Sequence, residues 1–159
     1  MRSFQTETKD ELETKRLGFN ISQDIQNLKE DNLSIIFLSG DLGSGKTVFT
    51  KGFMEGLGYQ GLVKSPTFSI VDIYDINSFK VFHFDLFRIK NPKEILEIGI
   101  EEYLEQKESL CIFEWPENAS SFLPSPDLEI KIKHSEDEEN NSRIIMLMTK
   151  LDLQVLHSL

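Results

Sequence analysis

The chain has 159 residues, 39% of them hydrophobic and 28% charged, a composition that excludes a disordered chain and suits a single globular domain over residues 1–159. Its 27 acidic residues outnumber its 17 basic ones, and the net charge of -10 disfavours autonomous binding to tRNA or to DNA. The single cysteine, Cys111, excludes an intramolecular disulfide, and no run of about 18 apolar residues is present to span a membrane, so we expect a cytoplasmic protein.

A helix is predicted near the start of the chain. Thr8 and Glu11 have the spacing of a capping box, in which two side chains bond to the backbone at a helix start. Apolar residues then recur at helical intervals, at Leu17, Ile21, Ile25 and Leu28. This pattern predicts an amphipathic helix that begins near Thr8 and ends before Asp31 and Asn32. The apolar run over residues 35–38 predicts a parallel strand buried on both faces.

A phosphate-binding loop directly follows this strand. Residues 40–47, Gly-Asp-Leu-Gly-Ser-Gly-Lys-Thr, match the pattern G-x-x-x-x-G-K-[ST] in full. Helical spacing resumes after the loop and stops at Gly58, with apolar residues at Phe49, Phe53, Met54 and Leu57. A plain glycine-rich turn would explain neither the paired Lys46 and Thr47 nor the strand and helix that flank the loop.

This loop predicts a site for ATP and Mg²⁺. Glycines let the backbone curl, so that successive N–H groups and the helix N-terminus point at phosphate oxygens. The Lys46 ammonium can lie between the β- and γ-phosphates, and the Thr47 hydroxyl can ligate the magnesium ion that bridges them. We expect the nucleotide to contact a continuous set of residues, Asp41, Leu42, Gly43, Ser44, Gly45, Lys46, Thr47 and Val48.

Further secondary-structure signals lie between the loop and residue 106. Partial alternation over residues 68–74, turn chemistry over residues 75–78 and an extended pattern over residues 81–84 predict a β-hairpin with a connection of four or five residues. Asn91, Pro92 and Glu94 are an N-cap residue, a proline at the first helical position and a glutamate at the third. They predict a helix to about Gln106.

The second half of the chain contains more predicted strands. Residues 110–113 form a buried apolar run closed by Glu114-Trp115-Pro116, and residues 128–133 and 143–148 predict an antiparallel pair. Residues 150–159 either pack on the domain or form a loose tail. In chain order these elements predict an α/β fold, a P-loop NTPase-like three-layer sandwich with parallel central strands and antiparallel hairpin and C-terminal strands.

Acidic residues at strand ends are candidates for metal binding and catalysis. Glu114 ends an apolar strand, where P-loop proteins hold magnesium with a carboxylate that is usually an aspartate. Its longer side chain either contacts the metal or only a metal-bound water, and an ordinary strand-end carboxylate is the alternative. Asp85 also closes a strand. It either orients the attacking water, binds a magnesium-bound water, or serves as a turn residue or helix cap. Thr67, in Ser65-Pro66-Thr67, occupies the place of a switch segment, but the tripeptide also suits a simple turn. His83 is more typical of packing than of catalysis, and Arg88 suits solvent exposure as well as phosphate binding.

A combination of four segments resembles the TsaE family, also called YjeE. The segments are residues 40–47, Val63-Lys64-Ser65-Pro66-Thr67-Phe68, His83-Phe84-Asp85-Leu86-Phe87-Arg88 and Phe113-Glu114-Trp115-Pro116-Glu117. Their order and spacing agree with the family over residues 8–148. The P-loop alone is shared by many families, whereas the combination is specific. Phe87, where a tyrosine is common, and Ser44, where an alanine is frequent, are mild departures.

The resemblance implies a magnesium-dependent ATPase, weak alone, that acts in making threonylcarbamoyladenosine (t6A) in tRNA. Family members act with TsaD and TsaB and with the separate synthase TsaC, so ATP is expected to regulate or reset the TsaD–TsaB transferase, with tRNA contacted through that complex. The resemblance also implies roles for residues: Lys46 as phosphate clamp, Thr47 and Glu114 as magnesium ligands, Asp85 and Thr67 as hydrolysis or switch residues. It places Thr8 near the nucleotide base, although Thr8 also suits a helix cap.

Other functions are compatible with the same loop. A nucleotide-gated adaptor would use ATP to order residues 65–68, with hydrolysis incidental. A small-molecule kinase usually has an arginine-bearing lid, and the sequence shows none. A GTPase is disfavoured because no Asn-Lys-x-Asp motif for reading the base occurs.

Overall fold

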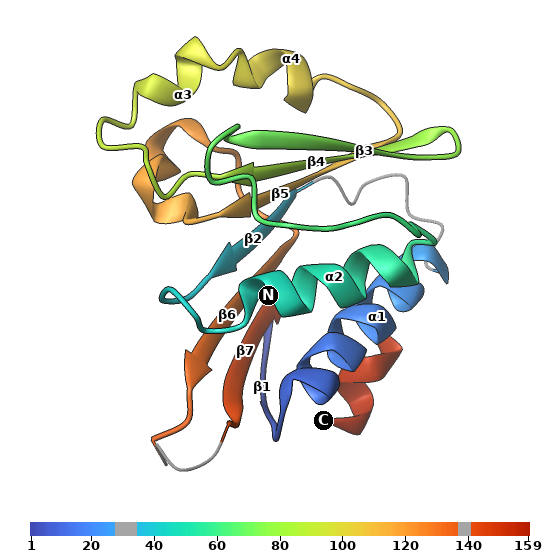
Figure 1. The fold of residues 1–159 in the computed structure, drawn as a ribbon. Coiled ribbons are helices and arrows are strands. Elements are labelled where there is room, and N and C mark those ends of the chain that lie inside the picture. Colours follow the sequence, from blue (N-terminus) through green and yellow to red (C-terminus); the bar gives the residue numbers. More distant parts are fainter. Residues whose placement is uncertain (28–34, 137–140) are drawn as a thin grey trace.

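A seven-stranded mixed β-sheet forms the centre of the molecule (Figure 1) in the computed structural model, which describes residues 1–27, 35–136 and 141–159. The strand order is β1-β7-β6-β2-β5-β4-β3. The strands are β1 (Arg2–Thr8), β2 (Ile35–Ser39), β3 (Val71–Ile76), β4 (Phe79–Asp85), β5 (Ser109–Glu114), β6 (Leu128–His134) and β7 (Arg143–Thr149).

Parallel pairing occurs in the middle of this sheet. β2 pairs in parallel with β5 and β6, and β4 pairs in parallel with β5. The outer pairs β3–β4, β6–β7 and β1–β7 are antiparallel. The predicted α/β fold, with parallel central strands and antiparallel hairpin and C-terminal strands, is confirmed. The carboxyl ends of β2, β4 and β5 consequently lie at one edge of the sheet, where α/β proteins bind ligands.

Helices on both faces of the sheet give three layers (Figure 1). α1 (Glu11–Asn27), α2 (Lys46–Gly56) and the 3-10 helix η3 (Gln154–Ser158) lie on one face. α3 (Glu94–Glu97), α4 (Ile100–Leu104) and the 3-10 helices η1 (Pro116–Asn118) and η2 (Ser120–Phe122) lie on the other. Strand alternation explains the layers, because Ile112 of β5 joins the first core and Phe113 joins the second. None of the described helices is long and apolar enough to cross a membrane.

The N-terminal residues form a strand, so the prediction of a helix that begins near Thr8 is wrong at its start. β1 pairs antiparallel with β7 along its whole length. Asp10, not Thr8, caps α1, because its Oδ1 accepts the N–H of Glu13 at 2.8 Å. Phe4 is the only large apolar residue in β1, so the strand has too weak an alternation to be recognised before its pairing is known. Leu28, Asp31 and Asn32, where the sequence predicts the end of the helix, lie outside the described residues.

The predicted β-hairpin is present, but its connection is shorter than predicted. β3 continues to Ile76, which pairs with Phe79 and leaves Asn77 and Ser78 as the turn. Asn77 has a φ of 58°, in the left-handed region that asparagine tolerates better than most residues. The chain therefore reverses within this short turn, and cross-strand pairing overrides the turn signal at Asp75.

The helix predicted to end near Gln106 is interrupted. The predicted capping bonds form, since Asn91 Oδ1 accepts the N–H of Lys93 at 3.1 Å and Glu94 Oε1 accepts the N–H of Asn91 at 2.9 Å. The helix itself begins later than predicted, at Glu94, with Lys93 as its N-cap residue. Gly99, however, has a φ of 75°, outside the helical range, and separates α3 from α4.

Residues 150–159 pack against the domain. Leu153 and Leu156 are 1% and 3% exposed and belong to the core on the α1 face. Asp24 of α1 accepts the N–H of Val155 at 2.6 Å. This segment is therefore part of the folded core, and it lies beside α1 on the side away from α2 (Figure 1).

α1 and α2 approach each other closely through glycines. A Cβ atom on Gly52 would lie 1.8 Å from the carbonyl oxygen of Lys15, and one on Gly18 would lie 2.4 Å from the carbonyl oxygen of Phe49. Both distances are far below van der Waals contact, so any larger residue would push the helices apart. Because the P-loop leads into α2, its position depends on this contact.

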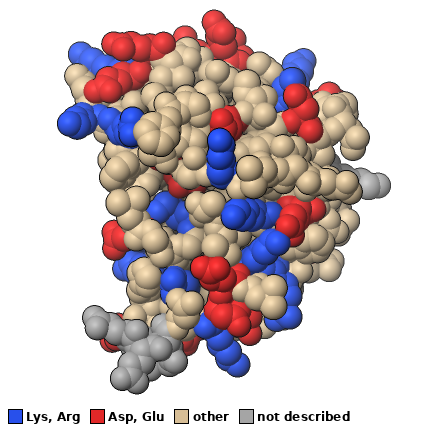
Figure 2. Space-filling view, in the orientation of Figure 1, with Lys and Arg blue, Asp and Glu red and all other residues tan. Residues whose placement is uncertain are grey.

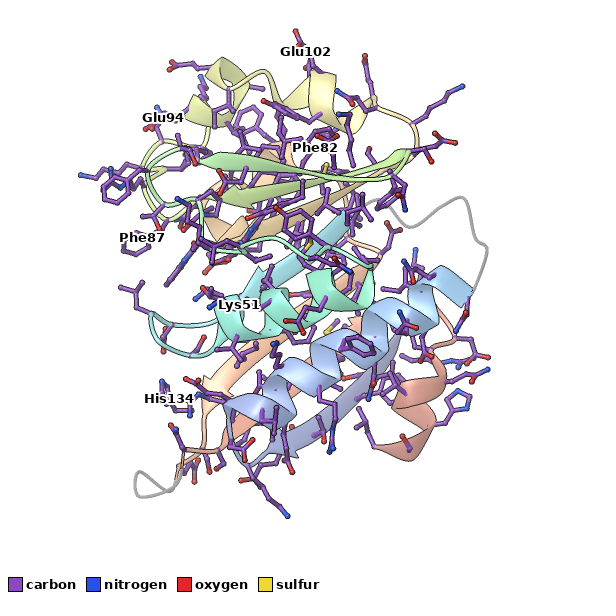
Figure 3. The ribbon with its side chains drawn as sticks, turned by 45° about the vertical axis from the view of Figure 1, so that its right-hand side comes forward. Lys51, Phe82, Phe87, Glu94, Glu102 and His134 are labelled. Atoms are coloured by element: carbon purple, nitrogen blue, oxygen red, sulfur yellow. The ribbon has the colours of Figure 1, made fainter. Side chains whose placement is uncertain are left out.

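We predict that Gly52→Ala destabilises the protein by about 1–3 kcal/mol, the usual cost of overpacking a close contact. Urea denaturation measures the loss. Lys51→Ala is the control, because Lys51 is exposed on the same helix (Figure 3). An unfolding midpoint equal to that of the wild type would show that α1 and α2 can separate without cost.

Candidate functional site

The P-loop curls in front of the N-terminus of α2. Gly40, Gly43 and Gly45 have φ values of 145°, 74° and 111°, which residues with a side chain rarely adopt. A Cβ atom on Gly40 would also lie 2.3 Å from the carbonyl oxygen of Ile132. The loop thus brings its N–H groups to the positive end of an 11-residue helix, an arrangement that suits an anion.

Lys46 is held inside this loop. It is 6% exposed, and its Nζ donates to the carbonyl oxygens of Gly40 at 2.6 Å and Asp41 at 3.0 Å. The ammonium also lies 4.5 Å from the centre of the Trp115 ring, a cation–π contact. Burial lowers the pKa of Lys46 below its ordinary value, against the opposing effect of nearby carboxylates, of which Glu114 is the strongest. A phosphate beside the ammonium would offset this desolvation.

Strand ends bring two carboxylates together beside the loop. β4 and β5 are parallel in a register that pairs Asp85 with Glu114. Both residues face the α2 layer, because they alternate with Phe84 and Phe113, which belong to the opposite core. Asp85 and Glu114 are 4% and 2% exposed. The two acidic residues singled out by the sequence therefore meet at one place.

A cleft of about 320 Å³ connects the loop with these strand ends. The predicted site residues that line it are Leu42, Gly43, Gly45, Lys46, Thr47, Val48, Thr67, Asp85 and Glu114. The lining is completed by Glu11, Ser65, Phe87 and Trp115. Backbone donors, a lysine, hydroxyls and carboxylates around one cleft can bind a phosphate chain together with a metal ion.

Hydrogen bonds hold the Asp85 carboxylate. Its Oδ2 accepts the hydroxyls of Ser65 at 2.6 Å and Thr67 at 3.0 Å, and its Oδ1 accepts the N–H of Phe87 at 3.0 Å. Residues 65–67 are thereby tied to the end of β4. A carboxylate has about four acceptor positions, so Oδ1 can accept one more donor beyond its contacts with the described residues.

A buried imidazole holds the Glu114 carboxylate. His83 Nε2 lies 2.8 Å from Glu114 Oε1, and the His83 side chain is fully buried. Within the described ranges, this is the only hydrogen bond to the Glu114 carboxylate. Its Oε2 is therefore available to a ligand in the cleft.

Trp115 and Arg143 also shape the site, and the sequence assigned a role to neither. Trp115 has a φ of 56° and a ψ of 46°, a left-handed conformation that is rare for a bulky residue, and its ring lies against Lys46. Arg143, buried at the start of β7, donates its Nε to the carbonyl oxygen of Ser44 at 2.8 Å. Trp115 belongs to a recognised motif, whereas Arg143 gave no signal because its contact joins residues far apart in the chain.

Some predicted residues lie outside this cleft. Thr8 is buried at the end of β1, and its Oγ1 lies 2.7 Å from Oγ1 of Thr14 in α1. Asp41 lines a neighbouring cavity. Ser44 is buried, and its Oγ has no hydrogen-bond partner in the part of the chain that the structure describes.

The neighbouring cavity is the larger of the two, at about 530 Å³, and Trp115 lines both. Its lining includes Asp41 but not Lys46, Asp85 or Glu114. The smaller cleft is therefore the candidate site, because it joins the loop, the lysine and the strand-end carboxylates.

The site could hold magnesium only with a small number of protein ligands. Among residues 1–27, 35–136 and 141–159, no group of three or more His, Cys, Asp or Glu side chains could enclose a metal ion. Magnesium is commonly held by one or two protein ligands, with phosphates and water completing its coordination. Thr47 and Glu114, which both line the cleft, fit that arrangement.

Comparison with known proteins relates the chain as a whole to a family. Residues 8–145 match the sequence profile of the family described as "Threonylcarbamoyl adenosine biosynthesis protein TsaE". The tRNA threonylcarbamoyladenosine biosynthesis protein TsaE of Haemophilus influenzae is 36% identical over 140 residues, which cover 88% of this chain and 88% of that protein. The protein of the same name from Rickettsia bellii is 36% identical over 140 residues, covering 87% of this chain and 92% of that protein. The crystal structure of Bacillus subtilis YdiB has a similar fold, with a TM-score of 0.73 and 28% identity, covering 99% of this chain and 93% of that one.

We predict that Lys46→Met leaves the ligand-free protein at least as stable as the wild type at pH 7. The lowered pKa of Lys46 means that burial disfavours the charged form. This penalty is fully present below the lowered pKa and disappears as the pH rises from there towards 10.5, the ordinary value. The difference between variant and wild type should therefore shrink at high pH.

Thermal unfolding at neutral and alkaline pH measures this difference, with Lys51→Met as the matched control on the exposed side of α2. A marked loss of stability in Lys46→Met at pH 7 would show that the bonds to the loop carbonyls outweigh the cost of the buried charge.

Proposed function

The chain belongs to the TsaE family, and from that premise we propose that it binds and hydrolyses Mg-ATP in the cleft beside the P-loop, as a part of threonylcarbamoyladenosine (t6A) synthesis. In this proposal, ATP hydrolysis regulates or resets the TsaD–TsaB transferase. The observation that supports ATP binding and hydrolysis is the convergence of four residues on one cleft at a helix N-terminus: Lys46, Thr47, Asp85 and Glu114.

The loop and Lys46 are the proposed phosphate-binding groups. Loop N–H groups and the helix end favour negative charge without any side-chain movement. Lys46 would exchange its bonds to the carbonyl oxygens of Gly40 and Asp41 for stronger bonds to phosphate oxygens, in which donor and acceptor are both charged. Phosphate binding would thus give the Lys46 ammonium, which is desolvated in the free protein, partners of opposite charge.

Thr47 and Glu114 are the proposed protein ligands of magnesium. When bound, magnesium would neutralise charge on the β- and γ-phosphates. Thr47 offers a hydroxyl at the start of α2, and Glu114 offers the carboxylate oxygen that His83 does not contact. Glu114 has a longer side chain than the usual aspartate, and it reaches the cleft from the end of β5.

Asp85 is proposed to orient the attacking water. Attack on the γ-phosphorus forms a new P–O bond and breaks the bond to the bridging oxygen, so that ADP and phosphate leave. Asp85 Oδ1 can accept a hydrogen bond and a proton from that water, while Oδ2 is occupied by Ser65 and Thr67. The direction of the carboxylate therefore depends on residues 65–67, as a switch segment requires.

Exposed apolar side chains near the cleft support a dependence on partner proteins. Leu42 and Phe87 line the cleft and are 68% and 42% exposed, and Phe68, next to Thr67, is 86% exposed. Phe87 projects at the edge of the molecule (Figure 3). The Arg88 guanidinium lies 4.4 Å from the centre of the Phe68 ring. Aromatic residues and arginine are enriched at protein interfaces, so we propose that TsaD and TsaB bind at this rim.

Direct tRNA binding is not part of the proposal. Figure 2 shows acidic side chains gathered at the top of the molecule, over α3 and α4. The acidic residues of these helices are Glu94, Glu97, Glu101 and Glu102. Together with the net charge of -10, they repel a phosphate backbone. The proposed contact with tRNA is through the TsaD–TsaB complex.

A nucleotide-gated adaptor is the second candidate, favoured by the bonds that tie Ser65 and Thr67 to Asp85. A nucleotide at the site could reorder this segment without being hydrolysed. An adaptor would bind TsaD and TsaB in the presence of non-hydrolysable ATP, and those partners would not accelerate turnover.

We predict that Asp85→Asn lowers ATP turnover, measured with TsaD and TsaB present, by about 100-fold or more, as expected for the loss of a general base. Mg-ATP affinity, measured by calorimetry, should change little because the hydrogen bonds of Asp85 are to Ser65, Thr67 and Phe87, outside the P-loop. Asp75→Asn is the matched control, since Asp75 is an exposed residue paired with Lys80.

Unchanged turnover in Asp85→Asn would exclude the proposed role of this carboxylate. Partner binding without accelerated turnover in the wild type would favour the adaptor. Absence of Mg-ATP binding by the wild type, even with TsaD and TsaB supplied, would overturn the proposed function.

We predict that Phe68→Ser weakens binding to TsaD and TsaB about tenfold or more, the typical effect of truncating a central aromatic side chain at an interface. Mg-ATP affinity of the isolated protein should be unchanged. Calorimetric titration measures both quantities, and Leu96→Ser is the control because Leu96 is a 45% exposed apolar residue on α3. Equal partner affinity in both variants would place the interface elsewhere.

A further inference from the structure

We propose that His83 is a positioning residue for the metal site: its imidazole holds one oxygen of Glu114 so that the other faces the magnesium position. The inference rests on the proposed function, because it requires Glu114 to be a magnesium ligand. It assigns a role to a histidine that its position in a strand would otherwise explain by packing alone.

Strand geometry brings the imidazole to the carboxylate. In the parallel register of β4 and β5, His83 pairs with Ile112 and Asp85 pairs with Glu114. His83 and Asp85 are two residues apart and therefore face the same side of the sheet as Glu114. His83 Nε2 reaches along the sheet to Glu114 Oε1, 2.8 Å away. Glu114, the proposed metal ligand, is thus held by a hydrogen bond from β4, the strand that also carries Asp85.

The chemistry of the pair determines which group donates. An ionised carboxylate can only accept, so His83 Nε2 must carry the hydrogen. His83 Nδ1 has no hydrogen-bond partner among the described residues. Among the described residues, the imidazole therefore makes one polar contact, the one to Glu114. No hydrogen bond offsets the desolvation of its second nitrogen, Nδ1.

Packing alone does not account for a histidine here. His83 is 0% exposed, and an apolar side chain of similar size would fill the same space without burying an unpaired nitrogen. The Tyr74 ring lies beside the imidazole, with ring centres 6.4 Å apart, so the imidazole is enclosed. A rigid donor at this place limits the rotation of Glu114.

The hydrogen bond from His83 matters because residue 114 is a glutamate and not the usual aspartate. A glutamate has one more rotatable bond than the usual aspartate, so its carboxylate loses more conformational freedom when it binds a metal. The bond from His83 removes part of that freedom before magnesium binds. It also leaves Oε2 as the oxygen that faces the cleft.

The test compares His83→Gln with His83→Leu in the full chain. The amide nitrogen of glutamine is as many bonds from the backbone as His83 Nε2, so it can donate to Glu114, whereas leucine cannot. Magnesium is titrated at fixed ATP, and binding is followed by fluorescence of Trp115, the only tryptophan, which lines the cleft.

We expect His83→Leu to weaken magnesium binding about 10- to 100-fold, the usual effect of removing a group that orients a metal ligand. ATP binding without magnesium should stay within about twofold, and excess magnesium should restore most of kcat while the apparent KM for magnesium stays high. His83→Gln should recover most of the magnesium affinity.

Wild-type magnesium affinity in a folded His83→Leu would overturn the inference. If that variant unfolds, His83→Asn replaces it, because its amide nitrogen is one bond too short to reach Glu114; equal magnesium affinity in the Asn and Gln variants would then overturn the inference. If the wild type itself shows no magnesium-dependent ATP binding, that result would instead overturn the proposed function, and this inference with it.

Discussion

The parallel register of β4 and β5 is the constraint on which the rest of the site depends. It sets Asp85 opposite Glu114, and the pairing of β2 with β5 brings the P-loop to the same edge of the sheet. Because side chains alternate along a strand, both carboxylates face α2 and Lys46. A slip of β4 by one residue would turn Asp85 towards the core beneath α3 and α4, so that it would no longer face the cleft beside Glu114.

Lys46, Asp85 and Glu114 form no ion pair with one another in the described part of the chain. Lys46 donates to backbone carbonyl oxygens, and no ion pair found among the described residues involves it. Asp85 and Glu114 are likewise held by hydroxyls, an amide and an imidazole. The bonds of Lys46 to carbonyl oxygens are weaker than a buried ion pair. This difference supports the proposal that Lys46 exchanges them for bonds to phosphate oxygens. Arg143 keeps the loop in place from β7.

Local sequence signals predicted most of the secondary-structure elements. The predictions that were wrong mostly concern residues whose structure depends on strand pairing. The loop, its flanking strand and α2 were predictable because glycine conformation and apolar runs act over a few residues. β1 was missed because its single large apolar residue, Phe4, gives no clear alternation without β7. The hairpin turn was predicted too long because pairing of Ile76 with Phe79 is stronger than local turn preference. Gly99 broke a helix whose capping signals at Asn91 and Glu94 were correct.

The sequence by itself determined the phosphate-binding loop pattern of the candidate site, since the loop glycines, Lys46 and Thr47 are close together in the chain and are arranged by local backbone geometry. It also indicated Asp85 and Glu114 as strand-end carboxylates. Only the tertiary structure decided what surrounds each of them: His83 against Glu114, residues 65–67 against Asp85, Arg143 against the loop, and Thr8 against Thr14 rather than in the cleft. The reason is physical. Apart from the contact of Thr8 with Thr14, these contacts join segments that are far apart in the chain and are brought together by sheet register and helix packing, which no short stretch of sequence encodes.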